Sequence, residues 1–143
     1  MKNFFAFLLC TTTLAGFVGC SDDEDKTFDQ TSLVGTWYCT YQKWVEDGES
    51  WDATYNADGS YYICFDDDST GYLDSGVDQL LELGGYYSFT YSISGNRIIV
   101  MLNNSSREFE DDWTIKSLSD TALELYWADK DYNITCKFVK KAN

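Results

Sequence analysis

The side chains that could do chemistry in this 143-residue chain are carboxylates and thiols, because it contains 24 Asp plus Glu and five Cys but no His. Without His, Ser-His-Asp and Cys-His nucleophilic mechanisms are excluded, as are a His-ligated zinc ion and a His proton shuttle. The formal net charge of −14 disfavours phosphate neutralisation by Lys and Arg. We therefore predict no nucleic-acid partner, and any hydrolysis would depend on a pair of carboxylates.

Four carboxylates, Glu46, Glu49, Glu108 and Glu110, are the candidates for such a pair. They alternate with outward-facing polar residues along predicted strands, which indicates a solvated wall. We predict that the protein is not an enzyme, and a carboxylate-pair hydrolase is kept as the third hypothesis. Residues 66–71 are similar to the start of an EF-hand loop, but Val77 stands where the bidentate Glu is required. We predict neither a metal site nor a cofactor.

The N-terminus reads as a targeting segment. Lys2 precedes a mostly apolar run over residues 4–18, which is shorter than the roughly 20 residues of a membrane-spanning helix. The Phe-Val-Gly-Cys sequence at 17–20 resembles the lipobox of bacterial lipoproteins. The resemblance implies that residues 1–19 are a signal peptide and that acyl chains on Cys20 anchor the protein to the membrane. An ordinary signal peptide is the alternative.

Residues 20–31 form the second segment, which begins with Cys20 and four carboxylates at 22–25. A run of this composition does not fold alone, so we interpret it as a tether. It resembles the acidic export signal of surface-displayed lipoproteins in some Gram-negative bacteria, which implies a lipid anchor in the outer membrane and exposure at the cell surface. A solvated linker without a sorting role is the alternative.

Residues 32–143 predict one all-β domain. Short segments with period-two alternation are separated by Gly, Asn and Asp, which is typical of antiparallel strands. Strands are expected at 34–45, 51–56, 61–65, 71–73, 86–94, 97–102, 109–117, 122–127 and 133–139. Asp47-Gly48, Asp58-Gly59 and Gly95-Asn96 predict hairpin turns. The resulting up-and-down meander is expected to close into a β-barrel of eight or nine strands. Residues 75–85 predict a short helix, as a lid over the barrel or as a surface loop.

The Gly35-Thr36-Trp37 sequence, preceded by Ser-Leu-Val, resembles the opening motif of the lipocalins and of bacterial lipocalin-like domains. The likeness extends to residues 91–98, 113–118 and 123–125. It implies a small lipocalin-like barrel in which a basic side chain from the last strand crosses Trp37. Lys137, Lys140 and Lys141 are available for that role.

The barrel interior is the expected binding site. If Trp37 points inward, strict alternation also points Cys39 and Tyr41 inward. An eight-stranded barrel is either filled by side chains or holds one small ligand. We predict binding of a small hydrophobic or amphipathic molecule by Trp37, Tyr41, Tyr87, Phe89, Tyr91 and Trp127. The alternative is a filled barrel whose outer wall or loops contact a protein or glycan partner in the cell envelope.

Three cysteines, Cys39, Cys64 and Cys136, belong to the predicted barrel. Barrel closure places the first strand beside the last, which brings Cys39 near Cys136. An exported protein can keep a disulfide. We therefore predict a Cys39–Cys136 disulfide with Cys64 free, and three buried thiols are the alternative.

Overall fold

A computed structural model describes residues 26–59, 61–74, 85–103 and 108–142. Its elements are α1 (Gln30–Leu33), β1 (Gly35–Glu46), β2 (Glu49–Thr54), β3 (Tyr62–Phe65), β4 (Thr70–Asp74), β5 (Tyr86–Ser94), β6 (Arg97–Asn103), β7 (Glu108–Leu118), β8 (Ala122–Ala128) and β9 (Tyr132–Lys140). The predicted all-β class is confirmed. The signal peptide, Cys20, the acidic run and most of the predicted helix lie outside the described residues.

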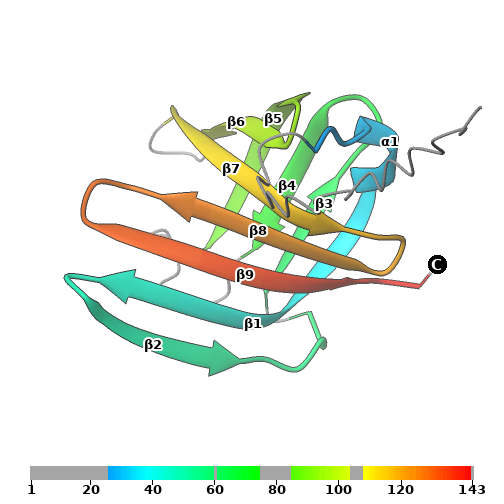
Figure 1. Cartoon of the computed structure of the whole chain (residues 1–143). Coiled ribbons are helices and arrows are strands. Elements are labelled where there is room, and N and C mark those ends of the chain that lie inside the picture. Colours follow the sequence, from blue (N-terminus) through cyan, green and yellow to red (C-terminus); the bar gives the residue numbers. More distant parts are fainter. Residues whose placement is uncertain (1–25, 60, 75–84, 104–107, 143) are drawn as a thin grey trace, which may run out of the picture.

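Eight strands form a closed antiparallel barrel, and β2 is an additional strand (Figure 1). Neighbouring strands from β3 to β9 pair in sequence order, and β9 pairs with β1. Closure satisfies the backbone groups that two sheet edges would otherwise expose. The predicted meander and its closure are therefore confirmed.

Strand β1 carries two strands along one of its edges. Its first residues pair with β3, from Gly35 opposite Phe65, and its last residues pair with β2, from Tyr41 opposite Thr54. Strands β2 and β3 thus follow each other along β1, with residues 55–61 between them. The hairpin predicted at Asp58-Gly59 was wrong, because the strands on either side of it pair with β1 and not with each other.

The other two turns are confirmed. Strand β1 turns into β2 at Asp47 and Gly48, which have φ angles of 50° and 82°. Strand β5 turns into β6 at Gly95, which has a φ of 64°, and Asn96. Positive φ at these positions is characteristic of tight turns whose twist matches that of the flanking strands.

A β-bulge between Cys39 and Tyr41 shifts the alternation of β1. Cys39 is buried before the bulge, and Gln42 is fully buried after it. Tyr41 consequently lies on the outer face, where the Lys137 Nζ is 5.6 Å from the centre of its ring. The inward orientation predicted for Tyr41 was wrong, because an extra residue in one strand reverses the faces of all residues that follow it.

One end of the barrel, here called the helix end, is closed by α1 and the start of β1. The buried side chain of Leu33 packs in the core, and the Trp37 Nε1 donates a hydrogen bond of 2.7 Å to the Leu33 carbonyl oxygen. The Lys140 Nζ lies 4.9 Å from the centre of the Trp37 ring. Lys140 therefore takes the position of the basic residue that the resemblance implied.

Aromatic rings fill the core behind the helix end. Phe65 and Phe89 meet edge to face with ring centres 5.5 Å apart, and Phe89 meets Trp113 in the same way at 5.9 Å. The Tyr91 ring lies 5.1 Å from that of Phe65, and its hydroxyl donates to the Asp66 carbonyl oxygen at 2.8 Å. Edge-to-face pairs add stability beyond the area they bury.

Gly71 gives a test of this packing. A Cβ at this position would lie 2.3 Å from the Cys64 carbonyl oxygen and 2.5 Å from the Phe89 ring. We expect Gly71→Ala to lower the free energy of unfolding by about 1–3 kcal/mol, since the chain must shift to make room. Urea denaturation measures this loss. Ser92→Ala, at an exposed position on the neighbouring strand, is the control, and equal stability of the two variants would contradict the packing described.

Candidate functional site

The end of the barrel opposite α1 is lined by aromatic side chains and is here called the aromatic end. Its inward rings belong to residues near the ends of six strands: Trp44 on β1, Trp51 on β2, Tyr87 on β5, Phe109 on β7, Trp127 on β8 and Tyr132 on β9. Trp44, Phe109 and Tyr132 are only partly buried and pack against the core. These rings form an apolar surface that the core does not fully cover.

Trp51 is the most exposed of these rings. It stands directly opposite Trp44 in the register, and the two rings stack with centres 6.2 Å apart and an angle of 18° between their planes. Trp44 in turn lies opposite the buried Ile134 on β9, so the stack belongs to the inner face. The Trp51 side chain is nevertheless 47% exposed, which places accessible indole surface on the inner face of the barrel wall.

Asp111 is a carboxylate on the inner face of β7. It lies opposite the buried Val100 and alternates with Phe109 and Trp113. The Trp113 Nε1 donates to Asp111 Oδ2 at 2.8 Å, and the Asp112 backbone N–H donates to Asp111 Oδ1 at 2.8 Å. Burial raises the pKa of Asp111 most strongly, the Trp113 hydrogen bond opposes that effect, and the nearby Asp129 charge adds to it.

Trp127 carries a buried polar atom without a partner. Its side chain is 4% exposed, and its ring lies 6.1 Å from that of Trp113. Among the described residues, the Trp127 Nε1 makes no hydrogen bond. A buried donor without a hydrogen-bond partner lowers the stability of the fold. An acceptor atom of a bound ligand could supply the missing partner of this N–H.

A buried polar cluster lies between the two ends, along β1 and β9. The Gln42 Nε2 donates to the Cys136 Sγ at 3.3 Å, and the Tyr55 hydroxyl donates to the Gln42 Oε1 at 2.8 Å. Burial raises the pKa of the Cys136 thiol, and the neighbouring Cys39 thiol raises it further. Tyr61 also contacts these two thiols, and burial raises its pKa.

The predicted Cys39–Cys136 disulfide is absent, since Cys39, Cys64 and Cys136 are all free and buried. Barrel closure does bring Cys39 and Cys136 together. The register places Cys39 opposite Phe138, and Cys136 opposite Gln42, so the two thiols are diagonal neighbours across the bulge. The prediction of a bond was wrong, because it rested on strand proximity and the register places Phe138, not Cys136, opposite Cys39.

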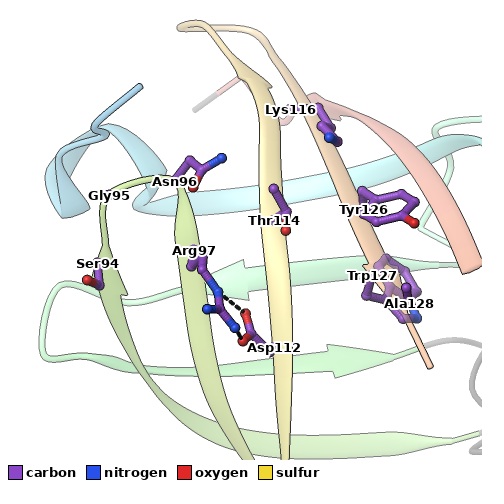
Figure 2. Close-up of a pocket in the computed structure, with 10 residues that line it drawn as sticks. All are labelled: Ser94, Gly95, Asn96, Arg97, Asp112, Thr114, Lys116, Tyr126, Trp127 and Ala128. Atoms are coloured by element: carbon purple, nitrogen blue, oxygen red, sulfur yellow. Dashed lines mark hydrogen bonds and ion pairs between the residues drawn. The ribbon is translucent and has the colours of Figure 1, made fainter. Parts of the chain in front are cut away.

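A second candidate site lies on the outer wall (Figure 2). Strands β6, β7 and β8 form a hollow of about 670 Å³ here. Its charged groups already have partners: the Arg97 guanidinium forms an ion pair with Asp112, and the Lys116 Nζ lies 5.1 Å from the centre of the Tyr126 ring. Arg97 and Asp112 face one another in Figure 2, where Trp127 is also among the residues that line the hollow.

Four tyrosines form a row on the outer face of β1, β3, β4 and β5. The ring centres of Tyr38 and Tyr62 are 5.9 Å apart, as are those of Tyr62 and Tyr72, and those of Tyr72 and Tyr86 are 5.7 Å apart. A hydrogen bond to Cys64 is the main cause that raises the pKa of Tyr72 to about 12. Tyr86 is 59% exposed, so this row presents aromatic surface on the outer wall.

The structure divides the predicted ligand-binding residues among three places. Tyr87 and Trp127 lie at the aromatic end, while Trp37, Phe89 and Tyr91 lie in the packed core towards the helix end, and Tyr41 lies outside. Sequence reasoning missed Trp44, Trp51, Phe109 and Asp111. For Asp111 a signal was present in the sequence. It occupies an alternate position on the same strand as Phe109, Trp113 and Ile115, so all four side chains are expected on one face.

The raised pKa of Asp111 gives a pH-dependent prediction. The folded chain holds the proton more tightly than the unfolded chain, so ionisation of Asp111 lowers the free energy of unfolding as the pH rises from about 3.8 through the folded pKa. We expect Asp111→Asn to raise Tm at neutral pH, with the gain lost at a pH below both pKa values. Thermal unfolding followed by circular dichroism measures this.

The neighbouring outward residue gives the control. Asp112→Asn removes a carboxylate that pairs with Arg97 on the outer face, so it should not give this gain. A lower Tm for Asp111→Asn than for the unchanged protein at neutral pH would show that the ionised carboxylate stabilises the fold.

Solved structures similar to this chain come from Bacteroides species. The chain is similar to a lipocalin-like protein from Bacteroides uniformis at 20% identity, with a TM-score of 0.49 over 77% of this chain and 99% of that one. It is also similar to an uncharacterized protein from Bacteroides eggerthii at 15% identity, with a TM-score of 0.48 over 76% of this chain and 99% of that one. No curated protein matches the chain.

Within the described ranges, the structure has no helix that is long and apolar enough to cross a bilayer. The family model described as "Lipocalin-like domain" matches residues 33–125, which is more than half of the chain. This range contains the Gly35-Thr36-Trp37 motif that Lys140 covers. The chain belongs to the lipocalin-like domain family.

Proposed function

We propose that this protein binds a small hydrophobic or amphipathic molecule at the aromatic end of its barrel and carries it while anchored to the bacterial outer membrane through acyl chains on Cys20. The observation that carries the proposal is the combination of exposed indole on the inner face at Trp51 with an unpaired N–H at Trp127. Rings supply the apolar contact, and the N–H with Asp111 supplies the polar contacts that orient a ligand.

The family supports binding over catalysis. A lipocalin-like barrel suggests small-molecule binding, and members of the family are generally binding proteins. The four carboxylates considered for a hydrolase do not favour catalysis either. Glu108 and Glu110 point out of β7, and Glu46 and Glu49 are exposed at the turn that joins β1 to β2.

Anchoring and surface exposure form the second part of the proposal. They are supported by the lipobox-like sequence ending at Cys20 and by the four carboxylates that follow it. Two or three acyl chains would hold the protein firmly, because each buried CH₂ contributes about 0.8 kcal/mol.

A second candidate function is contact with a protein or glycan in the envelope through the outer wall. The row of Tyr38, Tyr62, Tyr72 and Tyr86 favours it, since rings that are at least partly exposed and carry hydroxyl groups suit both apolar and polar contacts. This row lies on the opposite face of the barrel wall from Trp51. Substitutions at Tyr86 and Trp51 therefore separate the two functions.

Binding can be measured with the neutral dye Nile red, whose fluorescence rises in apolar surroundings. We expect Trp51→Ser to weaken dye binding by about three- to tenfold, because a stacking surface is lost. Tyr86→Ser removes an exposed ring from the outer wall and is the matched control. Unchanged affinity in Trp51→Ser, or an equal loss in Tyr86→Ser, would contradict binding at the aromatic end.

Lipidation has a separate test. Mass spectrometry of the protein extracted from bacterial membranes should find an acylated Cys20 at the N-terminus, and Cys20→Ser should release the protein from the membrane fraction. Protease treatment of intact cells should degrade the protein if it lies on the outer surface. An unmodified N-terminus at another residue would overturn the lipoprotein assignment.

A further inference from the structure

We propose that the molecule bound at the aromatic end carries a cationic nitrogen, an amine or ammonium group, and that Asp111 binds this group among the surrounding rings. This inference rests on the proposed function and specifies the chemical class of its ligand. It starts from an unusual placement, a carboxylate on the inner face of a barrel wall that is otherwise apolar at this level.

The rings around Asp111 suit a cation. Phe109 and Trp113 flank it on β7. Trp127 lies on the neighbouring strand β8, and the centre of its ring is 6.1 Å from that of Trp113. The faces of aromatic rings attract cations electrostatically, most strongly where water is excluded. A carboxylate beside two indoles and a phenyl ring therefore offers an ammonium group both an opposite charge and ring contacts.

The hydrogen bonds of Asp111 leave room for such a group. Among the described residues, each carboxylate oxygen accepts one hydrogen bond, Oδ1 from the Asp112 backbone N–H and Oδ2 from the Trp113 Nε1. A carboxylate has about four acceptor positions, so a ligand donor can still bind. Burial raises the pKa of Asp111, and a bound cation would offset that effect because it favours the ionised form.

The charges at this end of the barrel have one dominant sign. Glu46 and Glu49 face each other at the end of β1 and β2, and Asp129 lies close enough to Asp111 to raise its pKa. The inward lysine of the described strands, Lys140, is at the helix end over Trp37. Lys130 is exposed in the turn beside Asp129. A cationic ligand is therefore favoured here, and an anionic one is disfavoured.

The unpaired N–H of Trp127 adds a second feature of the ligand. It is buried on the same inner face and makes no hydrogen bond among the described residues. An amine whose body carries an oxygen or another acceptor would use both groups. This arrangement points to an aryl or alkyl amine with a polar substituent and not to a plain hydrocarbon or a fatty acid.

The test compares three small molecules of matched size and different charge: phenethylamine as the ammonium form, phenethyl alcohol as the neutral form and phenylacetate as the anion. Isothermal titration of the purified protein at neutral pH gives each affinity. We expect the affinity to be highest for the ammonium form, lower for the alcohol and lowest for the anion. In Asp111→Asn, the preference for the ammonium over the alcohol should fall by about tenfold or more, as for the loss of a charge-assisted hydrogen bond.

Asp112→Asn is the matched control, because it removes the adjacent carboxylate from the outer face and changes the net charge equally. It should keep the ammonium preference. Equal losses in the two variants would show attraction by overall charge, and equal affinity of the unchanged protein for ammonium and alcohol would show a neutral site. Either result overturns the cationic ligand, as does tighter binding of phenylacetate, while binding of the alcohol and Nile red tests the proposed function separately.

Discussion

The fold depends on the pairing of β1 along both of its edges. One edge meets β9 over almost the whole strand and closes the barrel, while the other carries β3 and then β2. The bulge after Cys39 lies within this doubly paired strand. Without it, Lys43 would face the interior and Gln42 would face water. The bulge therefore keeps a strongly hydrated ammonium group outside and admits an amide that Cys136 and Tyr55 satisfy.

The two ends of the barrel differ in what they contribute. At the helix end, Leu33, Trp37 and Lys140 close the barrel over an interlocked set of rings, and such packing supplies most of the stability. At the aromatic end, the chain retains a partly buried carboxylate and an unpaired indole N–H, both of which oppose folding. Groups that destabilise a fold are often retained where they bind a ligand. If the aromatic end binds a ligand as proposed, this division separates stability from binding along the barrel axis.

The sequence was sufficient to predict the strands and, apart from the pairing of β2 with β1 alone, the order in which they pair, because period-two alternation and turn residues are local signals. Their ends differ from the predicted ones by at most two residues. The orientation of Tyr41 could not be predicted in this way, because it depends on the bulge at Thr40. No glycine or other residue typical of a β-bulge marks that position in the sequence.

The site was less predictable than the fold. Aromatic residues at inward positions look alike in the sequence, yet Phe89 and Tyr91 fill the core whereas Trp51 remains exposed on the same face. What separates them is how far each strand extends beyond its neighbours, and that depends on register. Asp111 is different, since its alternation with Phe109 and Trp113 is visible in the sequence. Its neighbours Glu110 and Asp112 are also acidic, so the whole run looked like a solvated strand.

The extra strand β2 has a consequence for how copies of the protein meet. Within the described part of the chain, β2 pairs only with β1, so its second edge has free backbone donors and acceptors. Such an edge can recruit a strand from another molecule and start aggregation. Strand β2 is short, its side chains are largely exposed, and it carries Glu49 and Asp52. Repulsion between these charges on adjacent copies disfavours edge-to-edge association.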